Sequence, residues 1–512
     1  MLFNSYEFIL LFLPLVALVF YWLKSTEPAA APILWLVLAS LFFYSWWRPE
    51  YLSLLIYSIV GNYLLGLYLG SSEIELRIKK FVLGLGVIAN LSVLAYYKYA
   101  NLILDAVNRI VGLEWDSLSI LLPLAISFFT FQQIAYLVDS FQGKTKHYGF
   151  LHYCLFVSFF PQLIAGPIVH HRDMMPQFVA TRKSRFDVSN LAIGIVIFTA
   201  GLAKKVLIAD NVALYASPIF AKADAGGVVT FFEAWQAVSA YSLQLYFDFS
   251  GYCDMAVGAA RCFGIVLPMN FNSPYKSRNI IEFWRRWHIT LSNFLRDYLY
   301  IALGGNRKGA VRRYLNLFLT MLLGGLWHGA GWNFVIWGGL HGSYLMINHA
   351  WKALFSGVSI NDKLKPATSI ISLLLTLLAV AVGWVFFRAE TFNGAIEVLS
   401  GMLGVNGVLL PAKYFDRWGD FSVALKSSGV IFGDVATFKT LSAFWTMIPL
   451  WIFVCKAPNI YNLLASYRPV LEEVEPIGKI RFTPAMGILS GVIFLFGLLS
   501  LNQVSEFLYF QF

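Results

Sequence analysis

Two histidines are the clearest candidates for chemistry in this sequence. His328 occurs in GGLWHGAGW, inside an apolar stretch long enough to enter a membrane. An ionisable side chain is costly in such surroundings, so it is a functional candidate by default. Histidine also moves protons near neutral pH, which makes His328 a candidate general base. The alternative is a neutral core histidine that is hydrogen-bonded to a carbonyl.

His288 lies in NIIEFWRRWHITLSNFLRDYLYIALGG. We interpret this segment as an amphipathic helix of about 20 residues at the membrane interface. Arg285, His288, Ser292 and Arg296 follow one another at spacings of three and four, so we expect them to share a polar face turned to a site. The alternative is a plain interfacial anchor whose arginines meet lipid phosphates.

The elements around His328 must hold it inside the membrane. Apolar runs at 314–327 and 332–350 predict a hairpin with Trp327-His328-Gly329-Ala330-Gly331-Trp332 at its tip. Nearby glycines permit a broken helix and close backbone contact, which are tolerated only in a protein interior or along a cavity. They are Gly324, Gly325, Gly329 and Gly331. His341 lies on the return helix and either lines the same cavity or only packs.

Other titratable residues give weaker signals. His170 and His171 are adjacent in AGPIVHHRDMMPQF, which predicts a loop with solvated side chains. Asp248 and Asp254 lie six residues apart and would occupy different faces of a helix, unless Gly251 breaks it. We expect them to pair with arginines and fix the bundle. The spacing of histidines and of the four cysteines supports no metal site.

The composition is that of a membrane protein. Of 512 residues, 58% are hydrophobic and only 13% are charged, whereas soluble proteins carry about 25% charged residues. At about 20 residues per span, the apolar content fits about 11–13 membrane helices and re-entrant segments. We therefore predict an all-α polytopic membrane protein with a single domain over 1–512. A soluble enzyme, a disordered chain and a nucleic-acid-binding module are excluded.

The basic charge orients the chain. Segment 276–313 carries nine basic and two acidic residues, a net +7 of the chain's +10. The positive-inside rule places this segment in the cytoplasm. Segment 388–442 has five bases and five acids, as expected of the outer side. Counting spans onward places the C-terminal SEFLYFQF on the extracytoplasmic side.

Four stretches resemble a known family. The sequence is similar to the membrane-bound O-acyltransferase (MBOAT) family, over a core of about 120–350. It most resembles the bacterial branch that holds the alginate O-acetylation membrane subunit and the teichoic-acid D-alanylation membrane protein. The matching stretches are SFFTFQQIAYLVDSFQG (127–143), FFPQLIAGPIVHHRDMMPQF (159–178), the segment 243–309 with its WHITLS motif, and LLGGLWHGAGWNFVIWGGLHG (322–342).

The resemblance implies a fold and an activity. The fold would be a ring of helices around a thinned centre, with a central tunnel between the two faces. The activity would be transfer of an acyl group, most simply acetyl, from a cytoplasmic donor such as acetyl-CoA for O-acetylation of an exported polysaccharide. His328 matches the presumed catalytic histidine, and His288 matches the second signature histidine. No cofactor would be bound, because the acyl thioester is a substrate.

The resemblance also implies partners and further site residues. The protein would lie in a bacterial inner membrane and work with an extracytoplasmic acetyltransferase or another polysaccharide-modifying protein. Tyr509, in the terminal FLYFQF, matches a tyrosine proposed to relay the acyl group. An aromatic anchor at the membrane surface is the alternative. For the donor or substrate we expect binding by Arg285, Ser292, Arg296, Trp327 and His341.

Three other functions stay open at this point. A transporter or flippase of an acyl carrier would use a similar polytopic fold, although no inverted repeat is evident and the polar groups are histidines rather than paired acids. Transfer of D-alanyl to a cell-wall polymer would use the same machinery. A structural subunit of a secretion complex would not explain why His328, an ionisable residue, lies inside an apolar stretch.

Overall fold

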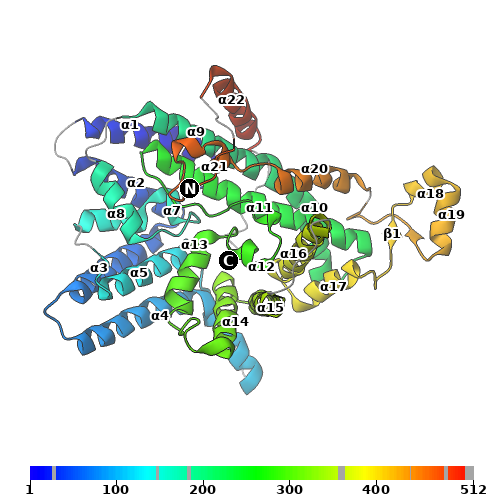
Figure 1. The fold of residues 1–512 in the computed structure, drawn as a ribbon, viewed down its shortest axis with the longest axis horizontal. Helices are drawn as coiled ribbons and strands as arrows, with labels where there is room; N and C mark the ends of the chain where they lie inside the picture. Colours follow the sequence, from blue (N-terminus) through cyan, green and yellow to red (C-terminus); the bar gives the residue numbers. More distant parts are fainter. Residues whose placement is uncertain are drawn as a thin grey trace.

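The computed structural model describes residues 1–25, 30–112, 114–145, 149–181, 186–355, 364–438, 440–477 and 482–501. Helices form nearly all of the regular structure in these ranges, and one short parallel strand pair accompanies them. Figure 1 shows the N-terminal helices packed on one side, α11 crossing the middle, and α18 and α19 projecting at the opposite end. The prediction of an all-α polytopic membrane protein is confirmed.

The helices follow one another with few long connections. The N-terminal group is η1 (Glu7–Phe12), α1 (Leu13–Lys24), α2 (Ala31–Ser45), η2 (Pro49–Tyr51), α3 (Leu52–Gly70), α4 (Leu76–Val111), α5 (Ile126–Phe141), α6 (Phe150–Ser158), α7 (Phe160–Leu163) and α8 (His171–Thr181). The central group is α9 (Val188–Leu202), η3 (Ala203–Ala209), α10 (Asp210–Asp224), α11 (Phe231–Cys262), η4 (Pro274–Lys276), α12 (Ile280–Trp284), α13 (Ile289–Phe294) and η5 (Leu295–Tyr300). The C-terminal group is α14 (Gly309–His328), α15 (Trp332–Leu354), α16 (Lys365–Arg388), α17 (Phe392–Met402), β1 (Leu409–Leu410), α18 (Lys413–Trp418), α19 (Asp420–Ser427), β2 (Ile431–Phe432), α20 (Ser442–Lys456), α21 (Ile460–Leu463), η7 (Ala465–Tyr467) and α22 (Pro484–Leu499).

Several helices are built to contact lipid. Among the described residues, five helical segments are long and apolar enough to cross a membrane: Glu7–Lys24, Pro49–Gly70, Leu76–Val111, Val188–Asp224 and Lys365–Arg388. Large apolar side chains such as Leu64, Ile88 and Leu374 are exposed on them, as a bilayer requires. Helices α2, α20 and α22 are apolar but shorter. The total of 11–13 membrane segments stays a prediction.

The centre of the bundle is the contact between α9 and α11. A Cβ added at Gly201 would lie 2.5 Å from the Gly251 carbonyl oxygen, and one at Gly258 would lie 2.5 Å from the Phe198 nitrogen. Glycine at these crossings therefore lets the two backbones touch, which is a common way to pack helices in a membrane. Helix α11 is buried along most of its length.

Buried ion pairs join η3, which continues α9, to α10 and α11. Lys205 Nζ lies 2.5 Å from Asp248 Oδ1 and 2.8 Å from Asp210 Oδ1, with all three side chains buried. Lys204 pairs with Asp254 at 2.6 Å, and the Tyr461 hydroxyl donates to the same carboxylate. Asp248 and Asp254 thus hold the bundle together as predicted. Their partners are lysines of η3 rather than arginines, and Gly251 does not break α11.

The predicted amphipathic helix around His288 is wrong as a single helix. The segment forms α12, then a break, then α13 and the π-helix η5. The break falls at His288, whose φ of 44° and ψ of 53° lie in the left-handed region. Arg285 precedes the break, whereas Ser292 and Arg296 follow it, so the four predicted residues do not lie on one helical face.

The predicted hairpin is confirmed. Helices α14 and α15 pack against each other along their lengths, and the chain reverses at Gly329–Gly331. Close approach near the tip depends on Gly325 and Gly338. A Cβ at Gly325 would lie 2.3 Å from the Phe334 carbonyl oxygen, and one at Gly338 would lie 2.5 Å from that of Met321. The hairpin therefore presents His328 at a tightly packed tip.

Candidate active site

His328 lies in a box of aromatic rings at the hairpin tip. It is the last residue of α14 and only 5% exposed. Ring centroids of Trp327, Trp337 and Phe387 lie 4.9, 5.1 and 5.2 Å from that of His328. These rings come from α14, α15 and α16, so three helices position one imidazole. Such packing excludes water and strengthens any polar interaction made inside.

His288 faces His328 across this box. The two imidazole centroids are 6.3 Å apart, and His288 is fully buried. The left-handed turn at His288 brings its side chain inward, against Phe249 of α11. Backbone strain of this kind in a non-glycine residue often accompanies a functional site. The two histidines that the sequence singled out are therefore neighbours, although 40 residues separate them.

Asn270 fixes the proton of His288. Asn270 Oδ1 accepts from the Thr290 backbone N–H at 3.3 Å and from the Thr290 hydroxyl at 3.0 Å. A backbone N–H only donates, so the Asn270 atom must be the carbonyl oxygen. His288 Nδ1 lies 3.1 Å from the same oxygen and must therefore carry the proton. In a neutral His288, Nε2 then holds a lone pair.

Four buried ring nitrogens in this box have no hydrogen-bond partner among the described protein atoms. They are His288 Nε2, His328 Nδ1 and the indole nitrogens of Trp327 and Trp337. Buried polar atoms are nearly always hydrogen-bonded, so each exception needs an explanation. A reacting group bound between the imidazoles would supply one. The arrangement can therefore accept, hold and return a proton in a water-poor setting.

An arginine-lined cavity of about 480 Å³ lies beside the aromatic box. Arg285, Ser292 and Arg296 line it as the sequence predicted, together with Arg313 and His349 from the hairpin. The Arg313 guanidinium donates to His349 Nδ1 at 2.8 Å. Asp297 pairs with Arg296 but does not line the cavity. The lining is thus cationic and suits an anionic group such as a phosphate.

Aromatic side chains separate this cavity from His328. Trp284 lines the cavity, and its indole Nε1–H donates to His341 Nδ1 at 3.2 Å. His341 is buried and packs on Trp337, which in turn contacts His328. His341 therefore belongs to the layer between cavity and histidine pair rather than to the cavity lining. The central tunnel that the family resemblance implies stays a prediction.

Trp327 packs beside the two histidines rather than in the cavity. Its indole stacks on Phe131 of α5 at 5.0 Å and lies 6.4 Å from His288. Its contact with α5 ties the hairpin tip to the N-terminal helices. Among the described residues, no group of three histidines, cysteines or acids could hold a metal ion.

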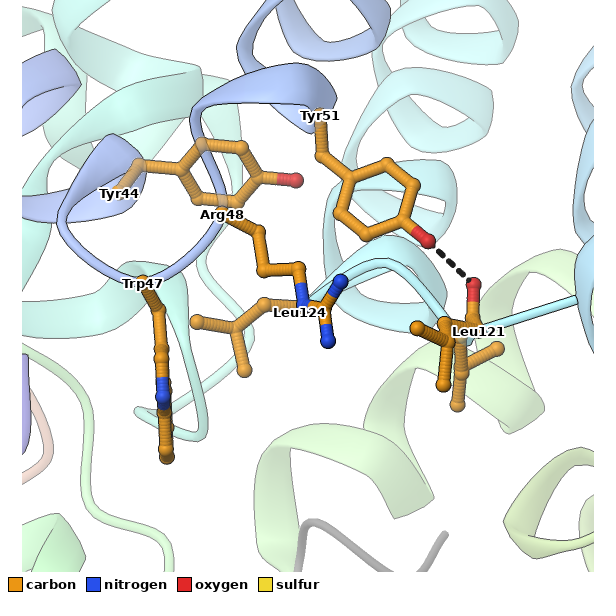
Figure 2. Close-up of a pocket in the computed structure, with 7 residues that line it drawn as sticks. Tyr44, Trp47, Arg48, Tyr51, Leu121 and Leu124 are labelled. Carbon is orange, nitrogen blue, oxygen red and sulfur yellow. Dashed lines mark hydrogen bonds between the residues drawn. The ribbon is translucent and has the colours of Figure 1, made fainter.

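Three further cavities are formed by the described residues, and one of them shares Arg296 with the arginine-lined cavity. One, of about 430 Å³, is formed by the end of α2, by η2 and by residues 121–124 (Figure 2). The Tyr51 hydroxyl donates to the Leu121 carbonyl at 2.7 Å across it. A second, of about 380 Å³, includes His170, Arg172, Thr290 and Arg296. A third, of about 600 Å³, lies at α18, α19 and β2. His171 is buried at 4% exposure, so the prediction of a solvated side chain is wrong for it, because α8 begins there and turns it inward.

Three residues at this site were missed from the sequence. Asn270 sets the state of His288, while Lys98 and Tyr99 of α4 bind the end of the helix that carries His328. Lys98 had a usable signal, because it is an ionisable residue inside the apolar run LSVLAYYKYANLIL. Asn270 had none, since a lone asparagine in a loop is common. Tyr509 lies outside the described residues.

A polytopic helical bundle that buries two facing histidines beside a cationic cavity has the features of a membrane enzyme. The family model of MBOAT, the membrane-bound O-acyltransferase family, matches residues 92–370. The chain belongs to this family and is an O-acyltransferase.

Named relatives agree with this assignment. The chain is 47% identical to the peptidoglycan O-acetyltransferase of Helicobacter pylori, over all of this chain and 98% of that protein. It is 43% identical to the probable alginate O-acetylase AlgI of Azotobacter vinelandii, over 78% of each chain. It is 28% identical to the teichoic acid D-alanyltransferase of Streptococcus thermophilus, over 46% of this chain and 58% of that one. All three names denote transfer of an acyl group, acetyl or D-alanyl, to peptidoglycan, alginate or teichoic acid.

Proposed function

We propose that this protein transfers an acetyl group from a cytoplasmic thioester donor, such as acetyl-CoA, toward an exported polysaccharide. The observation that carries the proposal is the facing pair His288 and His328, each with an unpartnered ring nitrogen, next to an arginine-lined cavity. The H. pylori and A. vinelandii relatives are named as O-acetylating proteins, which favours acetyl over D-alanyl.

The donor binds by its charged end. Phosphates of the donor contact Arg285 and Arg313 in the cavity, which lies on the strongly basic segment 276–313. The positive-inside rule assigns that segment to the cytoplasm, so the donor arrives from there. The thioester end of the donor then points toward the aromatic box, in the direction of Trp284 and His341.

The transfer itself is a direct displacement. An acceptor hydroxyl attacks the thioester carbonyl while His328 removes the hydroxyl proton. The new C–O bond forms, the C–S bond breaks, and His328 returns the proton to the departing thiolate. A neutral His288 offers a lone pair at Nε2, so it orients the donor or the attacking group by accepting a hydrogen bond. This step needs no covalent acyl-cysteine, because the hydroxyl attacks the thioester carbonyl directly.

The acetyl group leaves on the extracytoplasmic side of a bacterial inner membrane. An extracytoplasmic acetyltransferase or another polysaccharide-modifying partner receives it there. Tyr509 is the proposed relay, because a phenol ester has a good leaving group and passes its acyl to a sugar hydroxyl. Replacement of Tyr509 by Phe removes the hydroxyl and keeps the aromatic anchor. Polymer acetylation at the wild-type level in Tyr509→Phe cells would refute the relay and leave the histidine chemistry untouched.

The test uses the purified full-length protein in lipid nanodiscs with acetyl-CoA labelled in the acetyl group. We expect label on a hydroxyl acceptor and loss of this transfer in His328→Ala. Wild-type transfer by His328→Ala would refute the mechanism. The same protein in sealed vesicles separates a carrier from an enzyme: label that crosses the membrane without transfer would instead support a transporter. D-alanyl thioester in place of acetyl-CoA tests the other acyl group.

A further inference from the structure

The carbonyl groups at the end of α14 need hydrogen-bond donors from other parts of the protein. The last carbonyls of any helix have no partner within the helix. Here the chain leaves α14 at Gly329 in an extended conformation, with φ −160° and ψ 153°, so no glycine turn covers these carbonyls. Inside a membrane protein water is scarce, and other side chains must satisfy them.

Two neighbouring side chains of α4 donate hydrogen bonds to these carbonyls. Lys98 Nζ donates to the carbonyl of Trp327 at 2.5 Å and to that of His328 at 3.0 Å. The Tyr99 hydroxyl donates to the carbonyl of Leu326 at 2.7 Å. Three successive carbonyls at the end of α14 are therefore bound by two successive residues that lie more than 220 positions earlier.

The charge of Lys98 suits this place. A cation at the C-terminal end of a helix is stabilised by the helix dipole. The ammonium group also lies 5.7 Å from the centroid of the Trp327 ring, within cation–π range. Because one Nζ reaches both carbonyls, it fixes the direction of the peptide that joins Trp327 to His328 as well as its position.

Helix α4 is itself held at this point. Tyr97, the residue before Lys98, packs edge-on against Tyr51 at 6.1 Å. Tyr51 in turn bonds Leu121 across the cavity in Figure 2. On the other side of the tip, Trp327 packs on Phe128 and Phe131 of α5. Lys98 therefore links α4, which these contacts hold in place, to the backbone of His328, the candidate general base.

We propose that Lys98 is a positioning residue for the acyl transfer, acting through the backbone carbonyls of Trp327 and His328 to set the His328 imidazole opposite His288. This inference rests on the proposed function of His328 but not on the identity of the donor or acceptor. Lys98 does not line the arginine-lined cavity, so we expect its loss to affect turnover and to spare donor binding. Tyr99 acts in the same way, one residue farther from His328.

The experiment compares Lys98→Met with Lys98→Arg in nanodiscs. Met keeps the length and apolar stem of Lys but donates nothing, whereas Arg keeps the cation and several donors. We expect kcat to fall about 100-fold in Lys98→Met with the donor KM within about twofold, since a displacement near 1 Å has effects of that size. Lys98→Arg should recover at least about a tenth of the wild-type kcat. Tyr99→Phe should cause a smaller loss, about tenfold.

A second measurement does not depend on activity. Hydrogen exchange of the peptide around 322–335 reports whether the end of α14 opens. We expect faster exchange there in Lys98→Met but wild-type exchange in Lys98→Arg and in the control Lys80→Met, which changes an exposed lysine of the same helix. Faster exchange in Lys98→Met together with no acyl transfer by the wild type would refute the proposed function, while showing that Lys98 still holds the end of α14.

Three results would overturn the positioning role. One is wild-type kcat and wild-type exchange in Lys98→Met. Another is a rise in donor KM with unchanged kcat, which would make Lys98 a donor-binding residue. The third is equal loss of activity and of thermal stability in Lys98→Met and Lys98→Arg, which would make it a general stability residue.

Discussion

His288 Nδ1 lies 3.1 Å from Asn270 Oδ1, and this contact decides which nitrogen of His288 carries the proton. The Thr290 backbone N–H binds the same oxygen, so Asn270 Oδ1 can only accept. His288 is therefore held with its proton on Nδ1 and a lone pair on the unpartnered Nε2, and its ring centroid lies 6.3 Å from that of His328. Two histidines with different partners can take different parts in one reaction.

Loss of the Asn270 carbonyl should impair catalysis more than folding. In Asn270→Leu the side chain keeps its shape but no longer accepts a hydrogen bond, so His288 can adopt the other tautomer or rotate. We expect kcat to fall about 10- to 100-fold, the range for losing a buried hydrogen bond that orients a functional histidine. Steady-state kinetics with labelled acetyl donor measure this.

Cys253→Ala is the matched control for Asn270→Leu. The Asn270 side-chain amide donates to Cys253 Sγ at 3.3 Å, so this variant changes the other end of the same side chain. It should keep kcat within about threefold of wild type. An equal loss in Cys253→Ala and Asn270→Leu would show that packing of the loop, rather than the His288 tautomer, matters.

Much of the site was predictable because its signals are local in sequence. His328, its flanking glycines and the two apolar runs lie within a few turns, so they predicted the hairpin and its tip. The helix through His288 was mispredicted because apolar spacing does not reveal a left-handed residue in the middle of a helical pattern. Lys98 binds His328 from 230 positions away. Such pairing follows from tertiary packing and leaves no periodic pattern in the sequence.

Arg313 and Arg285 should govern donor affinity. Both line the cationic cavity, so under the proposed donor binding the removal of either guanidinium would take away a charged contact to a donor phosphate. We expect Arg313→Ala and Arg285→Ala each to raise the donor KM about tenfold with kcat within about twofold, corresponding to about 1.4 kcal/mol of binding. The effect should weaken as ionic strength rises.

Arg278→Ala is the control for these two arginines. Arg278 belongs to the same basic segment but is exposed and does not line the cavity. Its replacement should leave donor KM unchanged. A lower kcat with normal KM in Arg313→Ala would contradict donor binding at this cavity, as would equal KM changes in all three variants.

Lys205 should be essential for stability. It pairs with Asp248 and Asp210, and all three side chains are buried. Lys205→Met removes this cation from two buried carboxylates, which destabilises a protein by about 3–5 kcal/mol. Thermal unfolding of purified protein should show a marked drop in melting temperature. Lys204→Met should cause a smaller drop, because Lys204 is 18% exposed and Asp254 keeps its bond from Tyr461. Equal melting temperatures for wild type and Lys205→Met would refute the role of the pair.

Two glycines of the hairpin tip should differ in their sensitivity to the same substitution. A Cβ at Gly329 would lie 2.1 Å from the Phe334 ring, so Gly329→Ala must displace Phe334 or the tip itself. A Cβ at Gly331 would meet the same ring only at 3.6 Å, an ordinary contact. Because Gly329 follows His328 directly, the displacement reaches the imidazole. We expect Gly329→Ala to lower kcat at least about tenfold and Gly331→Ala to stay within about twofold. Kinetics of the two variants at matched expression measure the contrast, and similar kcat values for both would show that the tip tolerates movement and that His328 is not held as tightly as its packing implies.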